Sequence, residues 1–103
     1  LKLVQAVRNS IGKDFKLMVD ANHAYNLKDA LYVGRGLDEL DIYWFEEPVA
    51  PEDYNGYREL KKKISTSVAG GEAEFTKYGW NKLITNECID IAQPEVCGLG
   101  GIT

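Results

Sequence analysis

Three carboxylates recur at one position of a repeating unit, and this pattern constrains the fold of the chain more than any other feature. Asp20, Glu46 and Glu72 follow one another at intervals of 26 residues, and each comes directly after a short apolar or glycine-rich run. A repeat of this length is typical of one strand and one helix with their connections. The acids therefore mark the carboxyl ends of successive strands.

The spacing of apolar residues predicts the elements between these acids. Strands are predicted where short apolar runs occur, at 15–19, 42–45, 66–69 and 89–93. Helices are predicted by helical periodicity and end signals at 1–11, from the N-cap Asn26 to Leu40, from Pro51 to Ile64 and from Thr76 to Asn86. The fold class is therefore α/β, and about four βα units fit a partial (β/α)8 barrel or a doubly wound sheet.

Composition and charge indicate an ordinary soluble domain. The 103 residues are 45% hydrophobic and 27% charged, with a net charge of −4. The run Lys61–Lys63 is more typical of a solvated helix end than of a nucleic-acid contact. No apolar segment approaches the roughly 18 residues that a membrane span needs, and no secretory signal is visible. We therefore expect a cytoplasmic protein without nucleic-acid or membrane partners, with Cys88 and Cys97 reduced.

Two other ligand classes fit the sequence poorly. A dinucleotide site would need a third glycine after Gly70-Gly71, where Glu72 stands instead and would repel a pyrophosphate. A calcium loop starting at Asp20 would need glycine where Tyr25 stands. The glycine pair is better explained by a close approach of the backbone to its neighbours.

The three acids predict a metal site if the strands form a barrel. All strands of a parallel barrel open on one face, so the side chains that follow them converge. Clustered carboxylates repel one another unless a cation neutralises them, and oxygen ligands without His or Cys suit Mg²⁺. One acid after a strand is more often a cap or a solvated residue. Three at the same position favour Asp20, Glu46 and Glu72 as Mg²⁺ ligands.

Residues beside the acids are candidates for supporting roles. Asn22 lies two residues after Asp20, on the same side, and is predicted to orient a ligand or bind substrate. His23 is predicted to contact a polyol substrate, with packing near Tyr25 as the alternative. Glu47 is predicted to support the metal site or to pair with a lysine from elsewhere. Both tryptophans are interpreted as packing residues, and the last helix is expected to turn Leu83 and Ile84 toward the core with Trp80.

Four motifs carry a resemblance to a known family. Val-Asp-Ala-Asn at 19–22, Trp-Phe-Glu-Glu-Pro at 44–48, Ala-Gly-Gly-Glu at 69–72 and Gln-Pro-Glu-Val-Cys-Gly-Leu-Gly-Gly at 93–101 resemble the enolase superfamily in its mandelate racemase and muconate lactonizing branch. The resemblance covers the whole chain. It implies that residues 1–103 are a central fragment of the C-terminal (β/α)8 barrel domain, from the third to the sixth strand.

The resemblance also implies a reaction. Asp20, Glu46 and Glu72 would hold Mg²⁺ against the carboxylate of a sugar acid, while a base removes the α proton and the metal stabilises the enolate. Dehydration or isomerisation would follow, as in acid-sugar dehydratases and cycloisomerases. The family's lysine pair and catalytic histidine fall outside this chain. Glu95 stands where the family has an Asp that orients the histidine, so Glu95 is expected to take that role.

A second hypothesis is a half-barrel without activity, or an interaction module, because the bases are missing from this chain. The full-length protein is expected to form a homo-oligomer. A half-barrel would have open sheet edges, which invite association. The sequence names neither the substrate nor the product.

Overall fold

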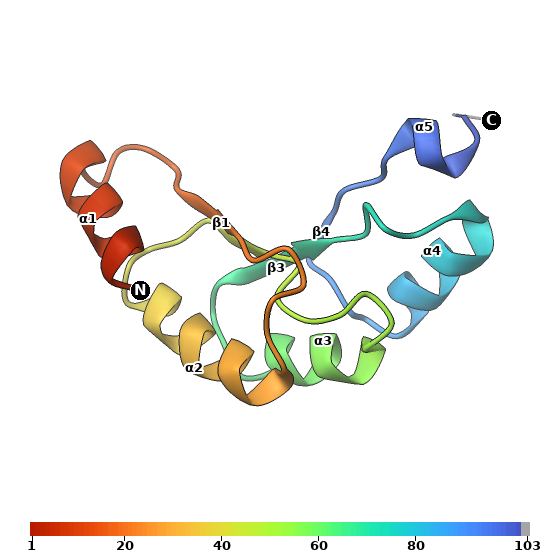
Figure 1. The fold of residues 1–103 in the computed structure, drawn as a ribbon, viewed down its shortest axis with the longest axis horizontal. Helices are drawn as coiled ribbons and strands as arrows, with labels where there is room; N and C mark the ends of the chain where they lie inside the picture. The colour runs from red at the N-terminus through yellow and green to blue at the C-terminus, as the bar shows by residue number, and fades with distance from the viewer. Residues whose placement is uncertain (102–103) are drawn as a thin grey trace.

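The computed structural model describes residues 1–101, in which helices and strands alternate along the chain (Figure 1). The elements are α1 (Lys2–Ile11), β1 (Met18–Asp20), α2 (Leu27–Asp38), β2 (Trp44–Glu46), α3 (Tyr54–Lys61), β3 (Ser67–Gly70), α4 (Thr76–Thr85), β4 (Ile91–Ala92) and α5 (Val96–Leu99). Four parallel strands form one sheet in the order β1-β2-β3-β4. This is the partial (β/α)8 architecture that the sequence predicts.

The sheet has one face covered by helices. Val19, Phe45 and Val68 are register partners on β1, β2 and β3, and all three pack into the core. α2 and α3 run side by side below the sheet in Figure 1, on the face that these residues occupy. Alternate residues of a strand point to opposite faces, so Asp20 and Glu46 point away from these helices.

The helices contribute a continuous apolar layer to this core. Phe45, Leu37, Leu60 and Val68 are fully buried, and Tyr57 of α3 is 2% exposed. The stripes predicted for α2 and α3 are therefore the faces that the helices bury. Ile84 of α4 is an exception, because it is 61% exposed while its neighbour Leu83 is buried. Consecutive helical residues are about 100° apart, so Leu83 faces the core with Trp80 while Ile84 points away from it.

Side-chain caps fix where two helices begin. Asn26 accepts a hydrogen bond from the Asp29 N–H at 3.0 Å, as the sequence predicts for the start of α2. Asp53 caps α3 by accepting from the Gly56 N–H at 2.8 Å. The helix therefore begins at Tyr54, and Pro51 lies in the preceding turn rather than inside the helix.

Two details of the sequence prediction are wrong near the sheet. Phe15 does not begin a strand: its side chain is 67% exposed and its carbonyl accepts a 2.7 Å hydrogen bond from Arg8 Nη1. Lys61 is only partly solvated, because its ammonium lies 3.0 Å from the Asp90 carboxylate and 3.0 Å from the Ile89 carbonyl, whereas Lys62 and Lys63 are exposed as predicted. This lysine joins α3 to the start of β4.

Both cysteines are free thiols, as predicted, with Cys88 in the core and Cys97 exposed on α5. Burial raises the pKa of the Cys88 thiol. Within residues 1–101, no helix combines the length and the apolar character needed to cross a membrane.

Candidate metal centre

The sheet register places two of the predicted ligands side by side. Asp20 and Glu46 are direct partners in the pairing of β1 with β2. Adjacent strands lie about 4.8 Å apart, and paired residues of parallel strands point to the same face. Ala69 is the partner of Glu46 on β3, so β3 reaches the same level three residues before Glu72. Asp20 and Glu46 therefore lie side by side at the carboxyl end of the sheet, and Glu72 lies in the turn that follows β3.

Gly71 sets the direction in which the chain leaves β3 toward Glu72. Its φ of +113° lies in a region that side-chain-bearing residues rarely adopt. A Cβ at this position would also collide with the ring of Trp80. Glycine is thus required both by the backbone angle and by the close approach that the sequence predicts here.

Two of the three acids, Asp20 and Glu46, accept hydrogen bonds from near neighbours. Asp20 Oδ1 accepts from the Asn22 N–H at 2.8 Å, and Glu46 Oε2 accepts from Trp44 Nε1–H at 2.9 Å. Over residues 1–101, no three His, Cys, Asp or Glu side chains gather closely enough to enclose a metal ion. Repulsion between like charges favours this separation of the oxygens. The ligand assignment of Asp20, Glu46 and Glu72 stays a prediction.

Burial and neighbouring charges change the acidity of Glu47, which follows Glu46 in the chain. Burial raises the pKa of Glu47, which is 2% exposed, and the charges of Glu72, Asp20 and Glu46 raise it further, whereas His23 lowers it. Four acids at one edge of the sheet form a strongly negative region. A donor set made of carboxylate oxygens fits a hard divalent cation such as Mg²⁺.

His23 pairs with the buried Glu47. Its Nε2 lies 3.0 Å from Glu47 Oε2, and its backbone N–H donates to the Glu47 carbonyl at 2.8 Å. Glu47 therefore finds its partner inside this chain, and His23 does more than pack near Tyr25. The Nδ1 atom of His23 is buried and has no hydrogen-bond partner among residues 1–101.

Backbone hydrogen bonds join the loops that follow β1 and β2. The Ala21 N–H donates to the Glu46 carbonyl at 2.9 Å, and the Tyr25 N–H donates to the Pro48 carbonyl at 3.2 Å. Three residues in these loops have positive φ: Asn22 at 46°, His23 at 61° and Glu47 at 41°. Such backbone angles cost of order 1–3 kcal/mol each and are found most often at functional sites.

The remaining candidates occupy different surroundings. Asn22 is exposed on the loop after β1. Glu95 follows β4 and caps α5, where its carboxylate accepts from the Gly98 N–H. Its predicted role toward a histidine elsewhere in the protein stays untested.

The sequence did not lead us to predict the hydrogen bond from Trp44 to Glu46. Trp44 was assigned to packing, yet its indole N–H is the hydrogen-bond partner of the predicted ligand Glu46. The signal was available, because residues two apart on a strand lie on the same face.

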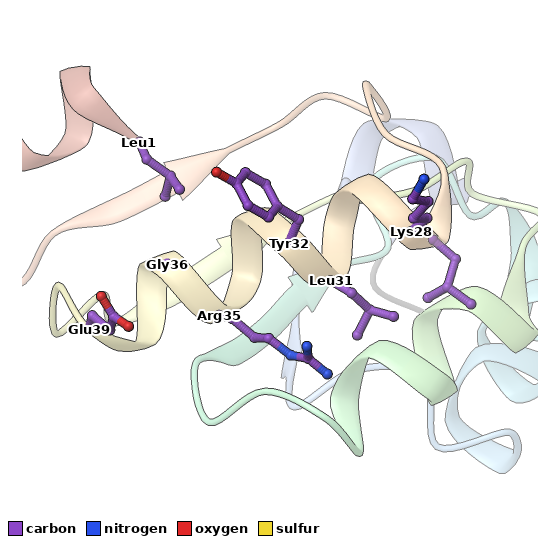
Figure 2. A pocket seen from close by; sticks show the side chains of 8 residues that line it. Leu1, Lys28, Leu31, Tyr32, Arg35, Gly36 and Glu39 are labelled. Atoms are coloured by element: carbon purple, nitrogen blue, oxygen red, sulfur yellow. The ribbon is translucent and has the colours of Figure 1, made fainter.

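An open groove elsewhere on the molecule is not part of this edge. It has a volume of about 860 Å³ and runs along α2 beside Leu1 (Figure 2). Its lining includes Leu31, Tyr32 and Arg35 but none of the three acids. The strand ends, rather than this groove, hold the candidate chemistry.

Comparisons with known proteins agree with the fold. The family model for the enolase C-terminal domain-like fold matches residues 1–103. D-galactarolactone cycloisomerase of Agrobacterium fabrum is 40% identical over 103 residues, and L-talarate/galactarate dehydratase of Salmonella typhimurium is 32% identical over 103 residues. The chain spans 27% and 26% of the lengths of these relatives.

Solved structures superpose closely. The 3,6-anhydro-D-galactonate cycloisomerase of Zobellia galactanivorans is 48% identical with a TM-score of 0.95, covering 97% of this chain and 28% of its own. A variant of L-talarate/galactarate dehydratase liganded with Mg and L-glucarate is 33% identical with a TM-score of 0.95, covering 98% of this chain and 26% of its own. A Streptomyces coelicolor racemase, 32% identical with a TM-score of 0.94, has bound magnesium and covers 97% of this chain and 28% of its own. Magnesium in these relatives agrees with the predicted cofactor, and the chain belongs to the enolase C-terminal domain-like family.

Proposed function

We propose that the protein containing this chain is a Mg²⁺-dependent lyase or isomerase that removes the proton α to the carboxylate of a sugar acid. The observation that carries the proposal is the pairing of Asp20 with Glu46 across β1 and β2, at the end of the sheet where β3 leads to Glu72 two residues further on. Relatives named as acid-sugar dehydratases and cycloisomerases support the reaction type.

Asp20, Glu46 and Glu72 would hold the metal, each through oxygens not engaged by Asn22 or Trp44. Bound there, Mg²⁺ would supply positive charge where negative charge develops on the substrate carboxylate. The acids at the carboxyl ends of the strands would repel the substrate carboxylate unless a cation neutralised them. Substrate binding would therefore depend on the metal.

Neighbouring residues would bind and orient the substrate. Asn22 is exposed on its loop and offers an amide to a sugar-acid hydroxyl. His23 is held by Glu47 through Nε2, and the exposed part of its ring would contact a polyol substrate. Glu95 would orient a histidine supplied by another part of the protein.

The reaction would end in dehydration when a β-hydroxyl leaves, and in isomerisation when the proton returns.

We further propose that the protein is a cytoplasmic homo-oligomer that acts on small sugar acids. The alternative is a half-barrel module without activity, which would neither bind Mg²⁺ nor turn over any acid sugar.

The replacement Glu46→Gln in the full-length protein tests the proposal. Removing one charged metal ligand forfeits several kcal/mol of charge stabilisation, so Mg²⁺-dependent turnover of an acid-sugar library should fall at least about 100-fold. Calorimetric titration with MgCl₂ should show the accompanying loss of Mg²⁺ binding. Glu39→Gln is the matched control, because Glu39 is an exposed acid at the end of α2. Unchanged Mg²⁺-dependent activity in Glu46→Gln would refute the proposal.

A further inference from the structure

The indole of Trp44 and the carboxylate of Glu46 form a contact on the open face of the sheet. Trp44 Nε1 lies 2.9 Å from Glu46 Oε2, and both residues belong to β2. Phe45 between them points to the opposite face and is fully buried in the helix-covered core. The strand's alternation therefore brings the indole beside the acid.

The chemistry of this donor suits a carboxylate that binds a metal. An indole N–H only donates, and a hydrogen bond to an ionised acceptor is about twice as strong as a neutral one. It occupies Oε2 and leaves the lone pairs of Oε1 free. A lysine in the same place would hold the carboxylate more strongly but would bring a positive charge that competes with the metal. A neutral donor orients Glu46 without that competition.

The surroundings of Trp44 fix its position. Its backbone pairs with Met18 on one side and Ser67 on the other. The ring of Tyr43 lies against the indole, with centroids 5.5 Å apart at an interplanar angle of 43°. Lys16 Nζ lies 3.8 Å from the centroid of the Tyr43 ring. The indole of Trp44 is thus held within the sheet, whereas Glu46 lies at the carboxyl end of β2.

We propose that Trp44 is a positioning residue for metal binding, which sets the orientation of the Glu46 carboxylate through its indole N–H. The inference rests on the proposed function, because it takes Glu46 to be a ligand. It adds that the affinity for Mg²⁺ depends on a side chain that does not contact the metal. Partners that orient metal ligands in this way contribute about 10–100-fold to metal affinity.

The test replaces the N–H without changing the shape of the ring. In the full-length protein, Trp44 is exchanged by site-specific incorporation for its benzothiophene analogue, in which sulfur stands in place of the N–H. Calorimetric titration with MgCl₂ alone should show Mg²⁺ binding 10–100-fold weaker than in the wild type. The melting temperature without Mg²⁺ should stay unchanged, which separates positioning from a general loss of structure. Trp44→Phe should weaken binding in the same direction.

The same exchange at Trp80 is the control, because the Trp80 Nε1 atom has no hydrogen-bond partner in the described part of the chain. Mg²⁺ affinity should not change there. Equal affinity in the wild type and in the Trp44 analogue would overturn the inference, even if Trp44→Phe fails to fold. Glu46→Gln distinguishes the two proposals: if it loses Mg²⁺ binding while the Trp44 analogue keeps it, only the role of Trp44 is wrong. Retained Mg²⁺ binding in Glu46→Gln would overturn both.

Discussion

At the scale of single residues, packing around α3 changes the acid–base behaviour of several side chains. Burial raises the pKa of Tyr57. The Tyr54 hydroxyl donates a hydrogen bond to the Glu74 carboxylate, and this bond raises the pKa of Tyr54 to about 12. This hydrogen bond, 2.8 Å long, joins α3 to the segment after β3 that carries Glu72. The hydroxyls of Tyr54 and Tyr57 therefore stay protonated to a higher pH than that of a free tyrosine.

The Tyr54–Glu74 hydrogen bond predicts a loss of stability at high pH. The pKa of Tyr54 is higher in the folded state, about 12 against the ordinary 10.0, so folding favours the protonated phenol. Its contribution is complete below pH 10 and disappears as the pH rises toward 12. Urea unfolding should show the advantage of the wild type over Tyr54→Phe shrinking across this window, by of the order of 1 kcal/mol.

Glu74→Gln provides the matched comparison, because it removes the charged acceptor and keeps the ring. Its unfolding free energy should approach that of the wild type at the alkaline end of the window. A difference between wild type and Tyr54→Phe that is independent of pH would contradict the assignment.

At the scale of elements, caps and register set the boundaries that periodicity alone leaves uncertain. Asn26 was recognised as a cap from its residue type, and the start of α2 is where the sequence predicts it. The helix predicted from Pro51 begins instead at Tyr54, because Asp53 is its N-cap. The strand predicted from Phe15 begins instead at Met18, because β2 pairs only from there. Local signals identified each element, and neighbouring elements determined its ends.

The cap of α2 gives a prediction at this scale. Asn26→Ala leaves the Asp29 N–H without its side-chain acceptor and should reduce the free energy of unfolding by about 1 kcal/mol. Asn26→Gly should cost only a few tenths of a kcal/mol, since glycine suits the capping conformation. Denaturant titrations of both variants would check the order. Equal losses in the two variants would mean that the hydrogen bond contributes little.

At the scale of the whole molecule, the described chain is an open arc rather than a closed barrel. It measures 42 × 27 × 19 Å, and α1 and α5 lie near opposite ends of the arc (Figure 1). β1 and β4 are the two edge strands of the sheet. Met18 and Tyr43 near the β1 edge are 44% and 43% exposed. Open edges and exposed apolar side chains favour association.

The 103-residue chain by itself should therefore self-associate. Size-exclusion chromatography with light scattering should show dimers or larger species whose proportion rises with protein concentration. A charge placed on the edge strand β1, Met18→Lys, should reduce this association, whereas replacing an exposed polar residue of α1, Gln5→Lys, should not. A folded monomer at all concentrations would contradict the prediction.

The sequence by itself determined the α/β class, the alternation of elements and the residues that follow each strand. These are local properties: apolar periodicity and turn chemistry depend on neighbours along the chain. The three acids could be named for the same reason, since one repeat places each of them after its strand. Their common edge could be predicted as well, because parallel strands end on one side of a sheet.

Only the tertiary structure decided which partners these residues find. The ion pair of His23 with Glu47 and that of Lys61 with Asp90 join side chains whose contacts depend on backbone angles and rotamers. Contacts between residues far apart in the chain also depend on register, which a periodic pattern does not encode. Residue type and spacing set what each side chain can do, and packing selects the one contact that it makes.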